Sequence, residues 1–113
     1  MRHEIIIFVT APNSEEAGRI ANALVSEQLA ACVNIVPSIE SIYRWEGRVT
    51  SDSEALMIIK TTDDRYVDVE RRVKELHSYS TPEIVAIPIE QGSREYLDWI
   101  RKSTAIDMDV NSN

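Results

Sequence analysis

The fold of this chain is decided by residues 29–60, LAACVNIVPSIESIYRWEGRVTSDSEALMIIK. From Cys32 to Trp45 this stretch is rich in Val, Ile, Tyr and Trp, which favour a pleated, half-buried surface. Glu46 and Gly47 then supply a two-residue turn, and residues 55–60 return as a second apolar run. The stretch therefore predicts one long β-hairpin.

This hairpin is longer than the domain that carries it. At about 3.3 Å per residue, the fourteen positions of its first strand extend roughly 46 Å. The usual scaling gives a globule roughly 34 Å across for a chain of 113 residues. Pro37 cannot donate to a β-ladder and marks a bulge or an edge. A ribbon that overhangs its core leaves apolar residues and open edges uncovered, so we expect an oligomer of identical chains.

Composition and charge narrow the class of protein. The chain is 43% apolar, which suits one domain with a single two-layer core. Nineteen Asp and Glu against twelve Lys and Arg give a net charge of -7, which disfavours nucleic acid and anionic membranes as partners. The sequence begins without a signal-peptide pattern, and no window has the roughly 20 apolar residues of a membrane span. We therefore expect a cytoplasmic protein.

Outside the hairpin, strand and helix patterns alternate. The apolar run at 4–10 predicts a strand in the middle of a sheet, and 83–89 predicts a last strand. Apolar residues at helical spacing predict three helices, with expected N-caps at Asn13, at Thr62 or Asp63, and at Ser93.

The order βαββαβ followed by a helix is the split βαβ, or ferredoxin-like, plan of the α+β class. Right-handed crossovers place the first two helices on one face of an antiparallel sheet. The opposite face then lacks cover within one chain, which again requires neighbouring subunits. We expect this domain to span 1–103 and a flexible tail to span 104–113, where residues are small, acidic or amide-bearing.

Four motifs carry a family resemblance: LAACVNIVPSIESIYRWEG, ALMIIKTT, VKELHSYSTPEIVAIPI and YLDWI. In this order and spacing, over about residues 5–101, the chain resembles the CutA divalent-cation-tolerance family. The resemblance implies a ferredoxin-like subunit and a tight homotrimer whose hairpins extend the sheets of neighbours, with an architecture like that of the PII signalling proteins. It also implies an association with copper and other divalent cations.

Two positions depart from the family pattern. The family usually has Pro and Glu around its His-x-Tyr motif, whereas this chain has Ser78 and Ser80. A carboxylate that would join a metal site is therefore absent at position 80. Arg44 stands where a second aromatic residue often precedes Trp45, which argues against an aromatic cage near the hairpin tip.

Cys32, His77 and Glu83 form the one set with soft, borderline and hard metal ligands. In a ferredoxin-like plan they converge either near one end of the sheet or at a cleft between subunits. The competing interpretation is structural. Cys32 is then a small buried hydrophobe, His77 favours the dipole at a helix C-terminus, and Glu83 is a solvated strand start.

A second set, Lys60, Tyr79, Trp45 and Trp99, would form with His77 a polar and aromatic pocket between subunits. Packing alone is the competing interpretation for these residues. HExxH, CxxC, P-loop and GxSxG motifs are absent, so we expect no enzyme. Nucleophilic catalysis by Cys32 with His77 as base is the enzymatic alternative. The leading hypothesis is a copper-binding homotrimer in divalent-cation tolerance, and the alternative is a PII-like small-ligand sensor or protein scaffold.

Overall fold

The computed structural model describes residues 2–105. The first predicted hairpin strand, Cys32–Trp45, is confirmed. In chain order the elements are β1 (Glu4–Ala11), α1 (Ser14–Ser26), β2 (Cys32–Trp45), β3 (Arg48–Thr62), a 3-10 turn (Asp63–Arg65), α2 (Tyr66–Leu76), β4 (Ile84–Pro88) and α3 (Arg94–Ser103).

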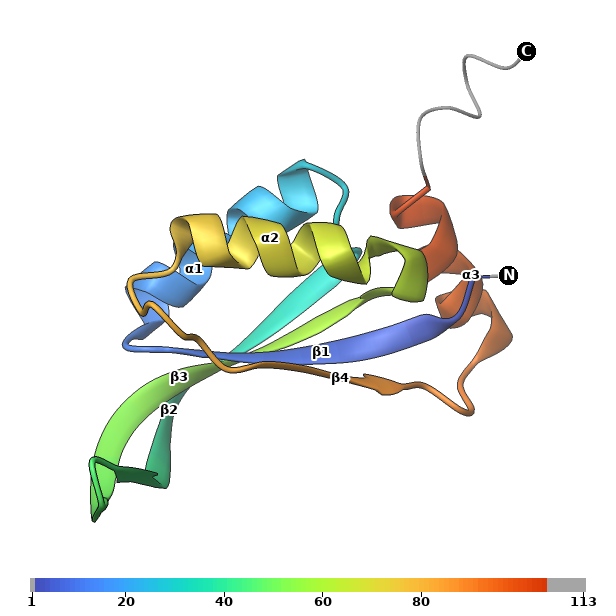
Figure 1. Ribbon diagram of the computed structural model, residues 1–113. Helices are drawn as coiled ribbons and strands as arrows, with labels where there is room; N and C mark the ends of the chain where they lie inside the picture. Colours follow the sequence, from blue (N-terminus) through green and yellow to red (C-terminus); the bar gives the residue numbers. More distant parts are fainter. Residues whose placement is uncertain (1, 106–113) are drawn as a thin grey trace.

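The four strands form one antiparallel sheet in the order β2-β3-β1-β4. Helices α1 and α2 lie side by side on one face of this sheet, and α3 lies at the end away from the hairpin tip (Figure 1). The predicted α+β, ferredoxin-like fold with a long hairpin and a C-terminal helix is therefore confirmed.

Two of the predicted helix caps are present and one prediction was wrong. The Asn13 side chain accepts a hydrogen bond from the Glu16 N–H at 2.8 Å, and Ser93 caps α3. Thr62 makes no side-chain cap bond, because its hydroxyl donates to Asp64 instead, at 2.6 Å. The chain passes through the 3-10 turn before α2 begins at Tyr66.

The core lies between the sheet and the two helices α1 and α2. Alternate residues of β1 and β3 point toward the helices, as period-two strands require. Burying each large aliphatic side chain contributes about 1.5–3 kcal/mol. Fully buried members of this layer include Ile7, Val9, Ile20, Leu24, Met57, Ile59, Val69 and Val73.

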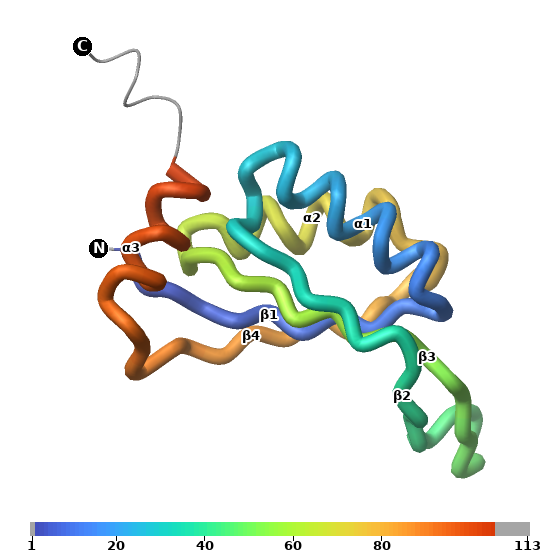
Figure 2. The backbone as a smooth tube through the Cα atoms, turned by 180° about the vertical axis from the view of Figure 1, so that it is seen from behind, coloured from blue at the N-terminus to red at the C-terminus, as the bar shows by residue number. Residues whose placement is uncertain are grey.

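The hairpin overhangs this core, as its length predicts. The chain measures 56 × 29 × 22 Å and has a radius of gyration of 15.2 Å, whereas a compact chain of this length has about 13 Å. Beyond the body of the sheet, β2 and β3 bend away together (Figure 2). Their outer half exposes large apolar side chains, among them Ile42 and Val49. Such a ribbon has few intramolecular contacts to hold it.

A β-bulge sets the direction of the hairpin side chains. The pairing of β2 with β3 runs from Cys32↔Lys60 to Val36↔Leu56 and resumes at Ile39↔Glu54. Residues 37 and 38 form the irregularity, at the proline that the sequence marks for it. The bulge adds one residue to β2 and so shifts the alternation of its side chains by one. Beyond the bulge, the odd-numbered residues of β2 lie on the face that its even-numbered residues occupy before the bulge.

The face of the sheet opposite α1 and α2 is apolar and only partly covered in residues 2–105. Ile6 and Phe8 of β1 pair with Ile87 and Val85 of β4 on this face. Val85 is 50% exposed and Ile87 is 48% exposed. We refer to these four residues, with Val36, Leu56 and Ile58, as the open face.

At the C-terminal end, Thr104 is buried and its hydroxyl and carbonyl accept hydrogen bonds from Arg2, at 2.9 and 3.0 Å. Residues 106–113 of the predicted tail lie outside the described part, so the domain boundary at 103 stays a prediction. None of the α-helices in residues 2–105 combines the length and the apolar run needed to cross a bilayer.

Candidate functional site

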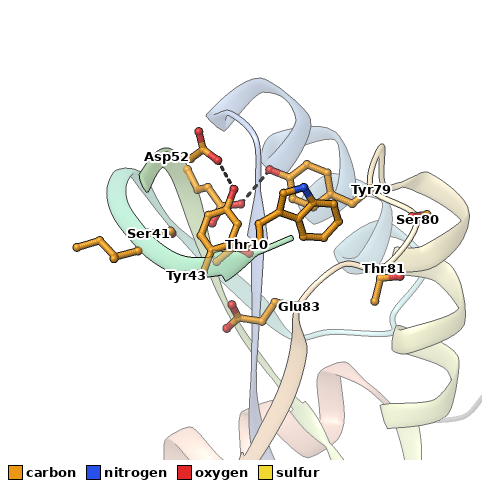
Figure 3. A pocket seen from close by; sticks show the side chains of 11 residues that line it. Thr10, Ser41, Tyr43, Asp52, Tyr79, Ser80, Thr81 and Glu83 are labelled. Atoms are coloured by element: carbon orange, nitrogen blue, oxygen red, sulfur yellow. Dashed lines mark hydrogen bonds between the residues drawn. The ribbon is translucent and has the colours of Figure 1, made fainter. Parts of the chain in front are cut away.

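A cleft of about 690 Å³ lies where the hairpin bends away from the sheet. Tyr43 and Trp45 reach it from β2, and Asp52 comes from β3. Tyr79 and Glu83 reach it from the segment between α2 and β4. Figure 3 shows Tyr43, Tyr79 and Asp52 around one space, with Glu83 on the side of β4. The cleft therefore joins segments that are far apart in sequence.

The bulge in β2 explains why these side chains meet. Tyr43 pairs with Thr50 and Ser41 pairs with Asp52, so after the bulge these residues share a face with Glu54. Without the shift, Tyr43 and Trp45 would point to the other side of the ribbon. Arg44 lies on that other side, so the absence of an aromatic residue at position 44 does not empty the cleft. The expectation about an aromatic cage near the hairpin tip stays a prediction.

Two tyrosine hydroxyls bind carboxylates within the cleft. The Tyr79 hydroxyl donates to Glu54 Oε2 at 2.9 Å, and the Tyr43 hydroxyl donates to Asp52. Burial, followed by the hydrogen bond to Glu54, raises the pKa of Tyr79 to about 12. The hydrogen bond to Asp52 is the main cause that raises the pKa of Tyr43. Both hydroxyls therefore stay protonated at neutral pH and hold their rings in place.

His77 is buried beside the cleft, where its ring hydrogen-bonds to two separate backbone segments. Its Nε2 lies 2.7 Å from the Thr10 carbonyl oxygen, which is only an acceptor, so Nε2 carries the proton. Its Nδ1 accepts from the Tyr79 backbone N–H at 3.0 Å. These bonds assign the neutral tautomer and use both ring nitrogens. The His77 and Tyr79 rings lie 4.8 Å apart, so the imidazole positions Tyr79.

Glu16 completes this arrangement from α1. Its Oε2 accepts from the Ser78 N–H at 2.8 Å and lies 3.4 Å from His77 Nδ1. That separation is an ion pair only for a protonated imidazole, and the Tyr79 N–H already occupies Nδ1. We therefore treat the two groups as parallel acceptors for consecutive backbone amides.

Within one chain, the predicted metal set does not come together. Glu83 lines the cleft, His77 is buried behind it, and Cys32 lies elsewhere at the start of β2. Residues 2–105 contain no group of three His, Cys, Asp or Glu side chains placed to hold a metal ion. A site that uses ligands from neighbouring subunits stays a prediction.

Cys32 belongs to a separate cluster near α3. Its partner across the ladder is Lys60, and the Lys60 ammonium donates to Asn34. The Cys32 Sγ lies 4.0 Å from the Asn34 Oδ1. Burial, and then the nearby Cys32, raises the pKa of Tyr96. The thiol is half-buried, on the side of the sheet that carries the open face.

The residues predicted for an intersubunit pocket fall in two regions, the cleft and the cluster around Cys32. Trp45 and Tyr79 line the cleft, whereas Lys60 lies beside Cys32. Trp99 packs against Tyr96 on α3, with ring centroids 5.4 Å apart. Only an arrangement of several subunits would join all four residues, and that stays a prediction.

Sequence reasoning missed Tyr43, Asp52 and Glu54 as cleft residues. A signal for them exists in the alternation along the hairpin, which brings Ser41, Tyr43 and Trp45 to one face. Which face that is depends on the bulge, and a proline alone does not reveal how many residues the bulge contains.

The fold and the cleft together define a class: ferredoxin-like α+β subunits with an overhanging hairpin and an open apolar sheet face. The chain belongs to the family of the CutA1 divalent ion tolerance protein, whose model matches residues 5–103. The resemblance found in the four motifs is therefore confirmed.

Named relatives cover most of the chain. It is 54% identical over 101 residues to the divalent-cation tolerance protein CutA of Thermus thermophilus, which spans 89% of this chain and 98% of that protein. It is 51% identical over 100 residues to the chloroplastic protein CutA of Arabidopsis thaliana, covering 88% of this chain and 55% of the relative. The chain thus spans the bacterial relative almost completely and about half of the plant relative.

Solved structures agree with this fold. The Thermus thermophilus divalent cation tolerance protein superposes with a TM-score of 0.88 at 54% identity, covering 90% of this chain and 99% of that one. CutA1 of Oryza sativa superposes with a TM-score of 0.89 at 48% identity, covering 91% and 94%. A relative from Archaeoglobus fulgidus, described as a periplasmic divalent cation tolerance protein, has a TM-score of 0.87 at 47% identity, with 90% and 99% covered.

Proposed function

We propose that this protein acts in divalent-cation tolerance as a cytoplasmic homotrimer that binds divalent metal, with copper the best candidate. Family membership and the names of the relatives support the tolerance role. The structural observation that carries the assembled state is the open face. Val85 and Ile87 leave about half of their surface exposed there, although isoleucine and valine are normally buried. The number three comes from the family resemblance.

Assembly would also cover the exposed apolar side chains of the hairpin. The exposed Ile42 and Val49 gain cover when the ribbon lies against a neighbouring sheet. In a closed ring with three-fold symmetry, one repeated contact covers the open face of every subunit. Large apolar contacts of this kind are typical of permanent oligomers.

For the metal, the structure favours Cys32 as the side chain to test. Its thiol is half-buried on the side of the open face, where a second chain would supply further ligands. A thiolate is a soft ligand that favours transition metals such as copper and zinc over hard cations, and copper heads the affinity order of the divalent ions. His77 already uses both ring nitrogens in backbone hydrogen bonds, so it would bind metal only after one of these bonds is broken.

We therefore expect Cys32→Ser to weaken copper binding at least tenfold, about 1.4 kcal/mol. The measurement is a competition titration with a chelator of known copper affinity, and His3→Ala is the control for chance binding near the N-terminus. Copper binds tightly to almost any set of N, O and S donors. Unchanged affinity in Cys32→Ser, or a larger loss in His3→Ala, would therefore rule out the Cys32 site.

The cleft supports a second candidate function, a PII-like sensor of a small ligand. Its volume of about 690 Å³ suits a small molecule, and it combines aromatic walls with a few polar groups. A ligand that binds only the folded state stabilises it by about 2.7 kcal/mol at a hundredfold excess over Kd. A thermal-shift screen of cations, anions and nucleotides tests this candidate. A complete lack of stabilisers would favour a protein scaffold instead.

A further inference from the structure

In a single chain, the cleft presents aromatic surface to solvent. Trp45 is 63% exposed, and Tyr43 and Tyr79 are each 39% exposed. The two tyrosine rings are held by their hydroxyl bonds to carboxylates. Three aromatic side chains therefore line one concavity in a chain that is only 6% aromatic.

Three carboxylates share this concavity, those of Asp52, Glu54 and Glu83. None of its lining residues is Lys, Arg or His. Among residues 2–105, the ion pairs join other carboxylates, such as Glu27 with Arg72, and include none of these three. The cleft therefore has a negative charge that no basic side chain of the described chain neutralises.

The tyrosine hydroxyls leave part of this charge available. The Tyr79 hydroxyl uses Oε2 of Glu54, and the Tyr43 hydroxyl uses Oδ2 of Asp52. The described hydrogen bonds occupy neither the second oxygen of these groups nor the carboxylate of Glu83. Because both hydroxyls stay protonated, they do not add repulsion as phenolates.

We propose that this cleft binds an organic cation, a guanidinium or alkylammonium group, between its aromatic walls and its carboxylates. This inference names the ligand class for the second candidate function and rests on it. A diffuse cation over an aromatic face gains about 0.5–2 kcal/mol, more as water is excluded. A carboxylate within reach adds a charge-assisted hydrogen bond.

Other ligand classes fit the same residues less well. An anion would meet three carboxylates without a cation among the lining residues. A hard divalent cation needs several oxygen ligands at about 2.0–2.6 Å around one point. Residues 2–105 place no three His, Cys, Asp or Glu side chains in that way, and aromatic walls contribute little to such a site.

The same cationic group could be supplied by two kinds of molecule. It is either a free small molecule or a Lys or Arg side chain of another polypeptide, including a second copy, because the cleft opens on the same side as the open face. The test therefore needs one arm for free ligands and one arm for assembly.

The first arm compares methylguanidinium with methylurea, which has nearly the same shape and no charge. The background variant is Trp99→Phe, so that the fluorescence reports only Trp45, the other of the two tryptophans. We expect saturable quenching of Trp45 by millimolar methylguanidinium and none by methylurea at the same concentration. Equal saturable quenching by the two compounds would overturn the proposal, even though a ligand cleft would still exist.

Matched variants test the residues. Glu83→Gln should weaken methylguanidinium binding about tenfold, while Glu90→Gln, an equal charge change on an exposed residue outside the cleft, should leave it unchanged. Tyr79→Leu should weaken binding about fivefold, whereas Tyr79→Phe, which keeps the ring, should lose less than about twofold. Equal losses in Glu83→Gln and Glu90→Gln would mean that only the net charge attracts the ligand, which contradicts the proposal.

The second arm decides the case in which neither free compound binds the assembled protein. If the cation is a side chain of another copy, Glu83→Gln should raise the concentration at which the assembly dissociates at least tenfold more than Glu90→Gln does. Analytical ultracentrifugation measures this concentration. No binding together with equal dissociation of the two variants would overturn the proposal. If the thermal-shift screen of cations, anions and nucleotides also finds no stabiliser, the proposed sensor function fails together with the organic-cation proposal. A stabilising anion would contradict the organic-cation proposal alone and would still support a sensor of a small ligand.

Discussion

Val85→Asp is expected to convert the proposed trimer into single folded chains. Val85 lies in β4, pairs with Phe8 and is 50% exposed on the open face. In a single chain the new carboxylate reaches water and costs little. In an apolar contact between subunits it would be a buried charge without a partner, which costs several kcal/mol per subunit. Sedimentation at micromolar concentration should show the loss of a species of three times the 12.8 kDa chain mass.

The control for this prediction is Val67→Asp on α2. Val67 is 71% exposed, so the same apolar-to-acidic change is made on the helix side of the molecule. We expect this variant to assemble like the wild type. Dissociation of both variants would indicate general charge repulsion instead of a specific contact. A wild-type protein that sediments as a single chain would remove the basis for the proposed trimer.

The hairpin could be predicted because its determinants are local. Strand-favouring residues fill Cys32–Trp45, and the turn needs positive φ angles at two positions. Glu46 and Gly47 have φ values of 50° and 77°, which matches a two-residue hairpin turn with glycine at its second position. Its overhang follows from length alone and is confirmed by the 56 Å extent of the chain.

The cleft could be predicted only in part, because its geometry depends on one register shift. Tyr79 and Trp45 were proposed as pocket residues, and both line it. Asp52 and Glu54 were not, since their common face with Tyr43 follows from the bulge after Val36. A shift of one residue reverses the direction of every later side chain, and Pro37 indicates its place without its size.

His77 shows the limit of residue type as a guide to chemistry. Its position after a helix and its imidazole suggested a metal ligand, with a favourable helix dipole as the competing interpretation. The structure assigns it a third role, because it joins the Thr10 carbonyl, 67 positions away in sequence, to the Tyr79 amide. Partners so distant in sequence are determined by packing, and local patterns do not contain them.

The role of His77 leads to the second large expected effect, a loss of stability in His77→Ala. The substitution would leave the Thr10 carbonyl and the Tyr79 N–H without partners in a site where the imidazole side chain is fully buried. Unsatisfied buried groups cost about 1–3 kcal/mol each, and the cavity adds to this, so we expect the free energy of unfolding to fall by about 3–5 kcal/mol. Urea denaturation at one fixed protein concentration measures it, because the stability of the proposed trimer would depend on concentration.

His3→Ala is the matched control for this substitution, because it removes the same side chain from an exposed position. We expect its free energy of unfolding to change by less than about 0.5 kcal/mol. A loss below about 1 kcal/mol in His77→Ala would mean that water replaces the imidazole in both bonds, and the structural role would be wrong. The result also determines how metal titrations are interpreted. If His77→Ala unfolds readily, its loss of copper binding reports on folding, and only Cys32→Ser tests the metal site directly.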